Sequence, residues 1–235
     1  MTPDALAKVM DETWPAAAVQ MVGPWMIRQG NGGGQRVSAA SAVARVSSDD
    51  VALAENAMLV LGQSPLFLIH KDDTALDALL EASGYRLHDP VVAYAARCAD
   101  LGQTPPQMTT FAHWPPMAVA VDLWAEGGIG PGRLAVMCRV AGAKTAILSR
   151  AADRVSGVAF LAVSGTTAML HALEVTPPLR RQGSAHNILQ AAAAWAQDHG
   201  ADVISLVVEQ ANGPARRLYA SFGMAVVGQY HYRQK

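Results

Sequence analysis

The sequence predicts a mixed α/β fold whose sheet is built mainly from antiparallel strand pairs. From residue 117 onward, helical and strand patterns alternate in the order α-α-β-β-β-α-β-α-β. The three consecutive strands in this series are separated only by turn residues, which favours hairpins. Residues 1–97 also mix strand and helix patterns, so the chain of 235 residues can form one large domain or two small ones.

The first half of the chain opens on a glycine-rich segment. Strands are expected at 21–28 and 36–46, around Gly30-Asn31-Gly32-Gly33-Gly34. Because no Gly-Lys-Ser/Thr follows and the segment runs from strand to strand, a phosphate-binding P-loop is excluded. The pattern then predicts a helix at 49–61, a strand at 65–70, a helix at 74–82 and a strand at 91–97.

Residues 98–116 predict a linker between a first domain at 1–97 and a second at 117–235. The pairs Pro105-Pro106 and Pro115-Pro116 prevent a long helix or a central strand there. Beyond the linker we expect helices at 117–125, 131–140, 183–199 and 213–221, and strands at 144–150, 157–163, 167–175, 202–208 and 225–232. The helix at 183–199 has one apolar face and ends at Gly200; the face contains Ile188, Leu189, Ala192, Trp195 and Ala196.

The composition excludes several classes of function. Eighteen basic and nineteen acidic residues give a formal net charge of −1, and no basic run indicates a nucleic-acid or membrane surface. Cys98 and Cys138 lack the spacing of a zinc or redox motif, so we expect no metal and two reduced, buried thiols. The N-terminus has no signal-peptide pattern and no stretch reaches transmembrane length, which predicts a soluble, cytoplasmic protein that acts on small molecules or proteins.

The segment 174–185 carries the strongest functional signal. It predicts a strand, a tight turn and a helix that begins beside Gly183, where unpaired backbone N–H groups and the helix dipole form an anion site. Gly183 and Ala185 are small enough for a phosphate to approach the main chain, and Arg180 and Arg181 add positive charge.

Two motifs resemble the Gcn5-related N-acetyltransferase (GNAT) superfamily. Arg180-x-x-Gly183-x-Ala185 matches the family's Gln/Arg-x-x-Gly-x-Gly/Ala signature between a strand and the following helix. The second match is Asn212-x-x-Ala215-x-x-Leu218-Tyr219, closed by Phe222-Gly223-Met224, where Met224 replaces the usual Phe. The resemblance covers about residues 115–235.

This resemblance implies a mixed, mainly antiparallel sheet with helices on both faces, and acetyl-CoA as co-substrate. The pantetheine arm is then expected beside Leu173, Glu174 and Val175. The pyrophosphate is expected at the turn, which comprises Arg180, Arg181, Gln182, Gly183, Ser184 and Ala185. Asn212 and Tyr219 complete the implied cofactor site, with Tyr219 as the acid that protonates the leaving thiolate.

A general base is needed because the attacking amine must be neutral. His171 is the first candidate, since residues 170–175 resemble the fourth strand of arylalkylamine N-acetyltransferase and histidine titrates near neutral pH. That enzyme has a second histidine where this chain has Met169. Glu174 and Glu209 are alternatives. By strand alternation Glu174 faces away from His171 unless a β-bulge intervenes.

The first half resembles a degenerate repeat of the second. Asp73, Leu76, Leu79, Leu80, Gly84 and Tyr85 fall at one constant offset from Asn212, Ala215, Leu218, Tyr219, Gly223 and Met224. Because Leu80 stands in the place of Tyr219 and no phosphate-binding motif precedes it, we expect no CoA site in this half. We expect it instead to line the acceptor pocket, with Trp25, Arg28 and Arg36 as candidates.

The expected function is transfer of an acetyl group from acetyl-CoA to a small-molecule or peptide primary amine, by direct attack in a ternary complex. Neither cysteine lies in a motif that suggests a covalent intermediate. The alternatives are transfer of another acyl group and a non-catalytic acyl-CoA-binding regulatory module. The identity of the acceptor is not encoded in any motif of the sequence.

Overall fold

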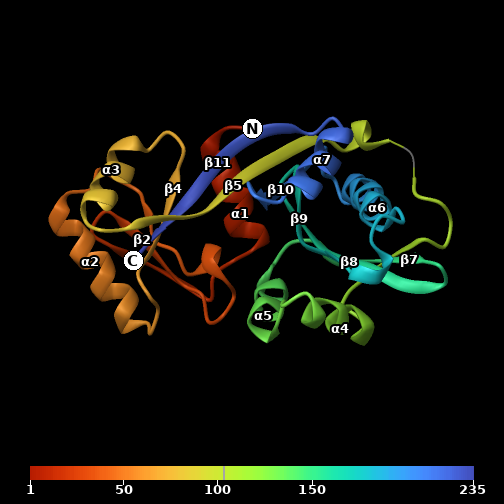
Figure 1. The fold of residues 1–235 in the computed structure, drawn as a ribbon, viewed down its shortest axis with the longest axis horizontal. Coiled ribbons are helices and arrows are strands. Elements are labelled where there is room, and N and C mark those ends of the chain that lie inside the picture. Colours follow the sequence, from red (N-terminus) through yellow and green to blue (C-terminus); the bar gives the residue numbers. More distant parts are fainter. Residues whose placement is uncertain (103) are drawn as a thin grey trace.

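The protein has two lobes that share one eight-stranded sheet (Figure 1). The computed structural model describes residues 1–102 and 104–235; residue 103, within the expected linker, lies outside the described residues. The strand order is β4-β11-β5-β10-β9-β8-β7-β6, and a separate small sheet has the order β1-β2-β3. Neighbouring strands of the large sheet pair antiparallel except β9 and β10, which run parallel. The expected mixed, mainly antiparallel fold class is confirmed.

Helices cover both faces of the sheet in the second half. Its elements are β6 (Thr110–His113), α4 (Ala118–Glu126), α5 (Pro131–Arg139), β7 (Lys144–Ala151), β8 (Arg154–Ser164), β9 (Thr167–Val175), α6 (Ser184–Asp198), β10 (Val203–Glu209), α7 (Gly213–Ser221) and β11 (Ala225–Gln234). Apolar side chains of α6 and α7 form one buried cluster with the sheet. Those of α4 and α5 form a second cluster on the opposite face, around Phe160.

The first half contains α1 (Pro3–Thr13), β1 (Ala18–Val22), β2 (Trp25–Gln29), β3 (Ser41–Ala42), α2 (Ser48–Val60), β4 (Leu66–His70), α3 (Thr74–Ala82) and β5 (Arg86–Arg97). The helix at 74–82 and the strand at 167–175 were predicted with the bounds that the structure has. Among the described residues, no helix has the length and apolar character needed to span a bilayer.

Two local predictions were wrong. The strand expected at 21–28 is a hairpin, because the chain turns at Gly23, which has φ +55°, and Pro24. The strand expected at 36–46 is a short 3-10 helix followed by the two-residue strand β3. The expected linker contributes β6, which is an edge strand and therefore tolerates the flanking prolines.

Each half of the molecule donates one strand to the other. β5 from the first half lies between β10 and β11, and β11 from the second half lies between β4 and β5. Figure 1 shows both strands running across from one lobe to the other. The two halves are therefore joined by main-chain hydrogen bonds as well as by side-chain packing.

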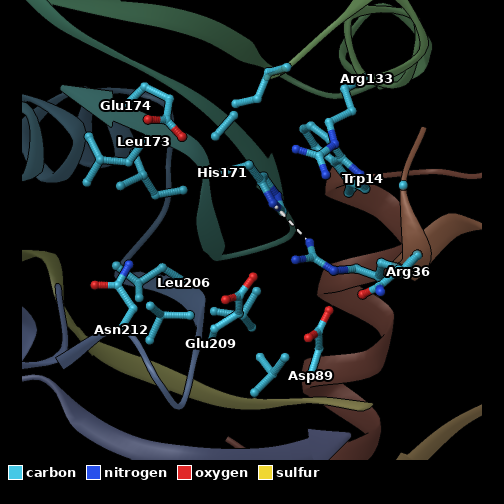
Figure 2. A pocket seen from close by; sticks show the side chains of 18 of the residues that line it. Trp14, Arg36, Asp89, Arg133, His171, Leu173, Glu174, Leu206, Glu209 and Asn212 are labelled. Carbon is cyan, nitrogen blue, oxygen red and sulfur yellow. Dashed lines mark hydrogen bonds between the residues drawn. The ribbon is translucent and has the colours of Figure 1, made fainter. Parts of the chain in front are cut away.

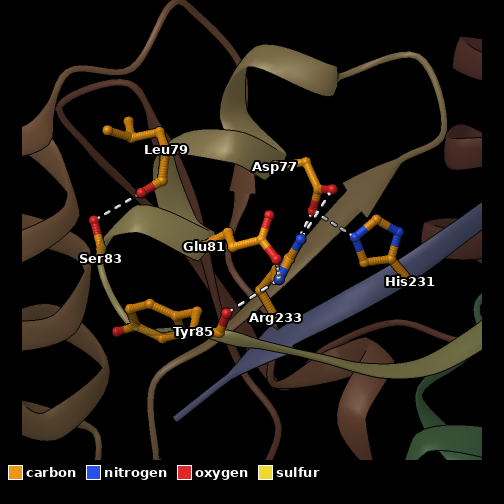
Figure 3. Close-up of polar contacts among 7 residues, drawn as sticks. All are labelled: Asp77, Leu79, Glu81, Ser83, Tyr85, His231 and Arg233. Atoms are coloured by element: carbon orange, nitrogen blue, oxygen red, sulfur yellow. Dashed lines mark hydrogen bonds and ion pairs between the residues drawn. The ribbon is translucent and has the colours of Figure 1, made fainter.

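The exchanged strands sit in equivalent positions of the two halves. α3 begins at 74 and ends at 82, and α7 begins at 213 and ends at 221, which gives a spacing of 139 residues at both ends. The same spacing relates Asp77 to Arg216 and Tyr94 to Arg233. Asp77 on α3 binds Arg233 on β11 through both carboxylate oxygens, at 2.7 and 3.1 Å (Figure 3).

The equivalent contact in the second half joins Arg216 on α7 to the hydroxyl of Tyr94 on β5 at 3.2 Å. Each donated strand is thus held by the same helix position of the half that receives it. β3 and β4 are also joined, by a parallel bridge from Ala40 to Phe67, as β9 and β10 are in the second half. These correspondences support the proposal that residues 1–97 are a degenerate repeat of residues 117–235.

Candidate active site

A β-bulge in β9 shapes the site. In the pairing with β8, Val158 lies opposite Glu174 and Phe160 lies opposite His171, so β9 has one extra residue between these pairs. The extra residue is accommodated where Ala172 adopts φ +51°. The Ala172 carbonyl accepts a hydrogen bond of 2.9 Å from the Trp124 indole of α4. The bulge that the alternation argument required is present, and it brings Glu174 and His171 to the same cavity.

Beyond the bulge, β9 and β10 separate. Their parallel register runs from Thr167 to Leu170 of β9 and ends opposite Leu206. Past this point the strands enclose a cavity of about 320 Å³. Its walls include residues 170–174 of β9, residues 206–209 of β10, and Tyr219 (Figure 2). The main chain of Leu173 and Glu174 on the side facing β10 therefore has no strand partner there.

The turn after β9 and the start of α6 have the features expected of an anion site. Arg181 and Gly183 have φ of +64° and +86°, and no side chain caps the helix. Among the described residues, no protein acceptor pairs with the backbone N–H groups of Arg181 to Ala185. Arg180 lies beside the turn because its Nε donates to the Val175 carbonyl at 3.0 Å. Several donors and a positive charge thus converge where the signature predicted a phosphate site.

The corresponding helix of the first half has no free anion site. α2 follows β3 as α6 follows β9, but its N-terminus is closed by a capping box. The Asp50 carboxylate accepts hydrogen bonds from the Ser47 amide at 2.8 Å and from the Ser47 hydroxyl at 2.6 Å, which lower the pKa of Asp50. A side-chain anion of the protein already occupies this helix start.

Tyr219 lies at the inner end of the opening. Its side chain is buried and lines the cavity. Burial, with a smaller contribution from Tyr94, raises the pKa of Tyr219 to about 12, so the phenol keeps its proton at neutral pH. The ring is positioned by α7, whose N-terminus is capped by Asn212 through a bond of 3.1 Å to the Ala215 amide. Asn212 also lines the cavity.

His171 is held as a neutral ring. The Arg36 guanidinium lies 3.2 Å from Nδ1, and since arginine can only donate, Nδ1 is the acceptor. Nε2 then carries the proton and donates to the Thr13 hydroxyl at 2.9 Å, which donates to the Val9 carbonyl at 2.6 Å. Burial, followed by the Arg36 charge, lowers the pKa of His171 well below its usual value. Both ring nitrogens are occupied, which disfavours the expected role of His171 as general base.

Glu174 differs from His171 in the direction of its pKa shift and in its hydrogen bonding. Burial raises the pKa of this carboxyl group, an effect partly offset by Arg180 and Arg133. None of the described residues donates a hydrogen bond to its side chain. Its carboxylate packs against Gly127 so closely that an added Cβ at Gly127 would lie 2.8 Å from the carboxylate carbon. Figure 2 shows the Glu174 side chain beside Leu173, on the same strand as His171.

The first half supplies one wall of the cavity, as expected, but only one of the three expected side chains. Arg36 lines the cavity together with Asp89 and Trp14. Trp25 is wrong as a candidate, because it is fully buried in the core of the first half and its indole donates to the Asp50 carbonyl. Arg28 is also wrong, since it forms a bidentate ion pair with Asp11 and lines a separate small cavity.

Several cavity residues carry no sequence signal. Trp14, Asp89 and Arg133 lie on elements far from the motifs and reach the cavity only through tertiary packing. The cysteines were predicted correctly in part: both are free and Cys98 is buried, which raises its pKa to about 11, but Cys138 is exposed.

Comparisons with known proteins agree with this geometry. Residues 137–224 match the acetyltransferase (GNAT) family. The chain is 24% identical over 233 residues to an uncharacterized N-acetyltransferase, YobR, of Bacillus subtilis, with 95% of this chain and 94% of that protein covered. Among solved structures, a GCN5-related N-acetyltransferase from Kribbella flavida matches with a TM-score of 0.75 and 15% identity, covering 100% of this chain and 96% of that one.

A tandem GNAT protein from the clavulanic acid biosynthesis pathway also has a similar fold. Its TM-score is 0.65 at 11% identity, and the match covers 84% of this chain and 74% of that one. Residues 137–224 of the second half therefore carry the sequence match to the acetyltransferase (GNAT) family, and the chain has a fold similar to GNAT proteins. The protein is an acyltransferase.

Proposed function

We propose that the protein transfers an acetyl group from acetyl-CoA to a primary amine, by direct attack of the amine in a ternary complex. The observation that carries this proposal is the arrangement of three features around β9, two of which line the cavity while the third lies in the turn that follows the strand. These are the free amides at the start of α6, the unpaired edge of β9 beyond its bulge, and the buried phenol of Tyr219.

The residues present fit acetyl-CoA, which supplies an activated acyl thioester when bound. The main-chain groups of Arg181 to Ala185, with Arg180, would hold the pyrophosphate. Leu173, Glu174 and Val175 would pair with the pantetheine arm, and Asn212 would bound the opening from α7. Tyr219 would donate its proton to the departing thiolate, since its phenol remains protonated and lies in a buried environment.

We assign the role of general base to Glu174 in place of His171. Glu174 faces the cavity because of the bulge and has a free carboxylate whose pKa is raised toward the neutral range. His171 accepts from Arg36 and would have to carry a second positive charge at 3.2 Å from that guanidinium if it took up a proton. His171 then serves as a neutral link between Thr13 and Arg36 that fixes the cavity wall.

Replacing Tyr219 tests the proposed function directly. Thiol release from acetyl-CoA is measured with a panel of primary amines for the wild type, Tyr219→Phe and Tyr94→Phe. Tyr219→Phe keeps the ring and should lower kcat on the order of 10²-fold or more, with acetyl-CoA affinity unchanged. Tyr94→Phe is the matched control, because Tyr94 contacts Tyr219 outside the cavity, and it should retain turnover. Full turnover by Tyr219→Phe would assign the proton to water.

A further inference from the structure

Arg36 is a cation in the cavity wall without a counter-ion. Its Nη1 contacts the neutral ring of His171, and its Nε is buried without any hydrogen-bond partner. Among the described residues, no carboxylate lies within ion-pair distance of this guanidinium. Burial lowers the pKa of Arg36, but Tyr230 and Tyr232 outweigh this and raise it, so the side chain stays charged. The cavity thus presents an uncompensated positive charge.

The second arginine of the cavity differs in its surroundings. Arg133 packs its guanidinium against Gly34, with 3.3 Å between Nε and the position of an added Cβ. It also lies near enough to Glu174 to lower the pKa of that carboxyl group, so its charge is partly compensated by an acid of the protein. Arg36 has no such neighbour, because the groups that surround it are His171, Tyr230 and Tyr232.

Acidic side chains occupy other parts of the same cavity. Asp89, Glu174 and Glu209 line it, and Asp89 pairs with His88 at 3.2 Å rather than with Arg36. Figure 2 shows the Glu209 and Asp89 side chains in the same view of the cavity as Arg36. The cavity therefore contains carboxylates suited to an ammonium group and, among the described residues, a guanidinium that is within ion-pair distance of none of them and is suited to an anion.

We infer that the acceptor is a small dipolar molecule that carries an oxyanion as well as its primary amine, and that Arg36 binds this oxyanion. The inference rests on the proposed acyl transfer to an amine. A guanidinium binds carboxylate and phosphate through the same N–H donors. The site therefore specifies a negatively charged oxygen group, and the acceptors tested below distinguish carboxylate from phosphate. Arg36 is then a specificity-determining residue supplied by the half of the chain that has no cofactor site.

The test compares acceptors that differ only in the anion. Wild type, Arg36→Gln and Arg45→Gln are assayed with glycine, β-alanine and 4-aminobutyrate, with the carboxamide of each, and with 2-aminoethyl phosphate. Arg45 is exposed in the same half and does not line the cavity, so Arg45→Gln is the matched control. For each amino acid and its carboxamide, the ratio of the two kcat/KM values is compared between the wild type and each variant. The two amines of a pair differ in basicity by the same amount for every protein, so this difference cancels.

We expect the wild type to prefer the anionic member of a pair. Arg36→Gln should lower kcat/KM for anionic acceptors on the order of 10-fold to 100-fold, mainly through KM, and leave the carboxamides nearly unchanged. Preference for the amino acids or for the aminoalkyl phosphate identifies the oxyanion. Three results would overturn the inference. The wild type shows no preference for anionic acceptors, Arg36→Gln keeps the wild-type preference, or the preference is lost in Arg133→Gln and not in Arg36→Gln.

A binding measurement separates this inference from the proposed function. Calorimetry with the free protein, using the anionic acceptor that binds the wild type most tightly, does not depend on acyl transfer. Weaker binding by Arg36→Gln than by Arg45→Gln supports the anion site even if no thiol is released with any amine, an outcome that would contradict the proposed function alone. Equal affinity of Arg36→Gln and wild type for that acceptor contradicts the anion site.

Discussion

Two side chains three residues apart on β9 have opposite protonation properties. Glu174 keeps a proton to higher pH than an ordinary carboxyl group, because burial raises its pKa. His171 loses its proton at lower pH than an ordinary histidine, because burial and Arg36 lower its pKa. In the range around neutral pH, only Glu174 has both a shifted pKa in the useful direction and a free atom to accept a proton.

The two roles predict different pH profiles. A base must be deprotonated, so wild-type kcat/KM should fall as pH falls through the raised pKa of Glu174. Glu174→Gln should lower kcat/KM near pH 7 on the order of 10²–10⁴-fold and recover as pH rises, because the acceptor then loses its proton in solution. His171→Gln should keep the wild-type shape of the profile, since the ring is already neutral across this range.

The contrary pattern would restore His171 as the base. In that pattern, Glu174→Gln keeps the wild-type pH profile of kcat/KM, and only His171→Gln loses kcat/KM below pH 8. Loss in neither variant would direct attention to Glu209, which lines the cavity from β10.

At the scale of single elements, the start of α6 is the proposed anion site. Gly183 has φ +86°, and apart from its chain neighbours no atom of the described residues lies within 4 Å of an added Cβ, so the space beside it is open to a ligand. Gly183→Glu would place a negative charge in that space, and we expect loss of measurable CoA binding in a folded protein, as followed by calorimetry.

Gly200 offers a matched control at the opposite end of the same helix. It has φ +82° and equally open surroundings, so Gly200→Glu carries the same backbone cost without approaching the phosphate site. Circular dichroism of both variants checks that α6 is retained. Unchanged CoA affinity in Gly183→Glu would remove the phosphate site from the start of α6, and equal loss in Gly200→Glu would attribute the effect to helix destabilisation.

The elements also show how far the sequence can predict this fold. Regular periodicity located α3, β9 and α7 within their observed bounds, and local motifs predicted an anion site at a helix start that the structure leaves without a side-chain cap among the described residues. The bulge was not predicted because nothing in the sequence around Ala172 marks it; it is stabilised by Trp124, a residue 48 positions away. Trp25 and Arg28 were wrongly expected to line the cavity for the same reason. A strand pattern shows which side chains share a face, but not which part of the protein that face packs against.

At the scale of the whole molecule, the described residues of the two halves differ at the helix start that corresponds to the proposed anion site. The start of α6 is open, whereas Asp50 closes the start of α2, and Leu80 stands where the second half has Tyr219. We therefore expect one CoA bound per chain in calorimetric titration. Two equivalent sites would contradict the proposal that the first half is a degenerate repeat without cofactor binding, and Asp50→Ala should not create a second site.

The exchange of β5 and β11 constrains how such a protein can change over generations. When a domain is duplicated, one copy can lose its functional residues if the other copy performs the chemistry. In the proposed degenerate repeat, the first half has no counterpart of the phosphate-binding turn or of Tyr219, but it keeps its last strand, because β5 lies between β10 and β11 in the shared sheet. The two halves must therefore be retained together. A substitution at Arg36 would change the acceptor preference and leave the residues proposed for acyl transfer unaltered.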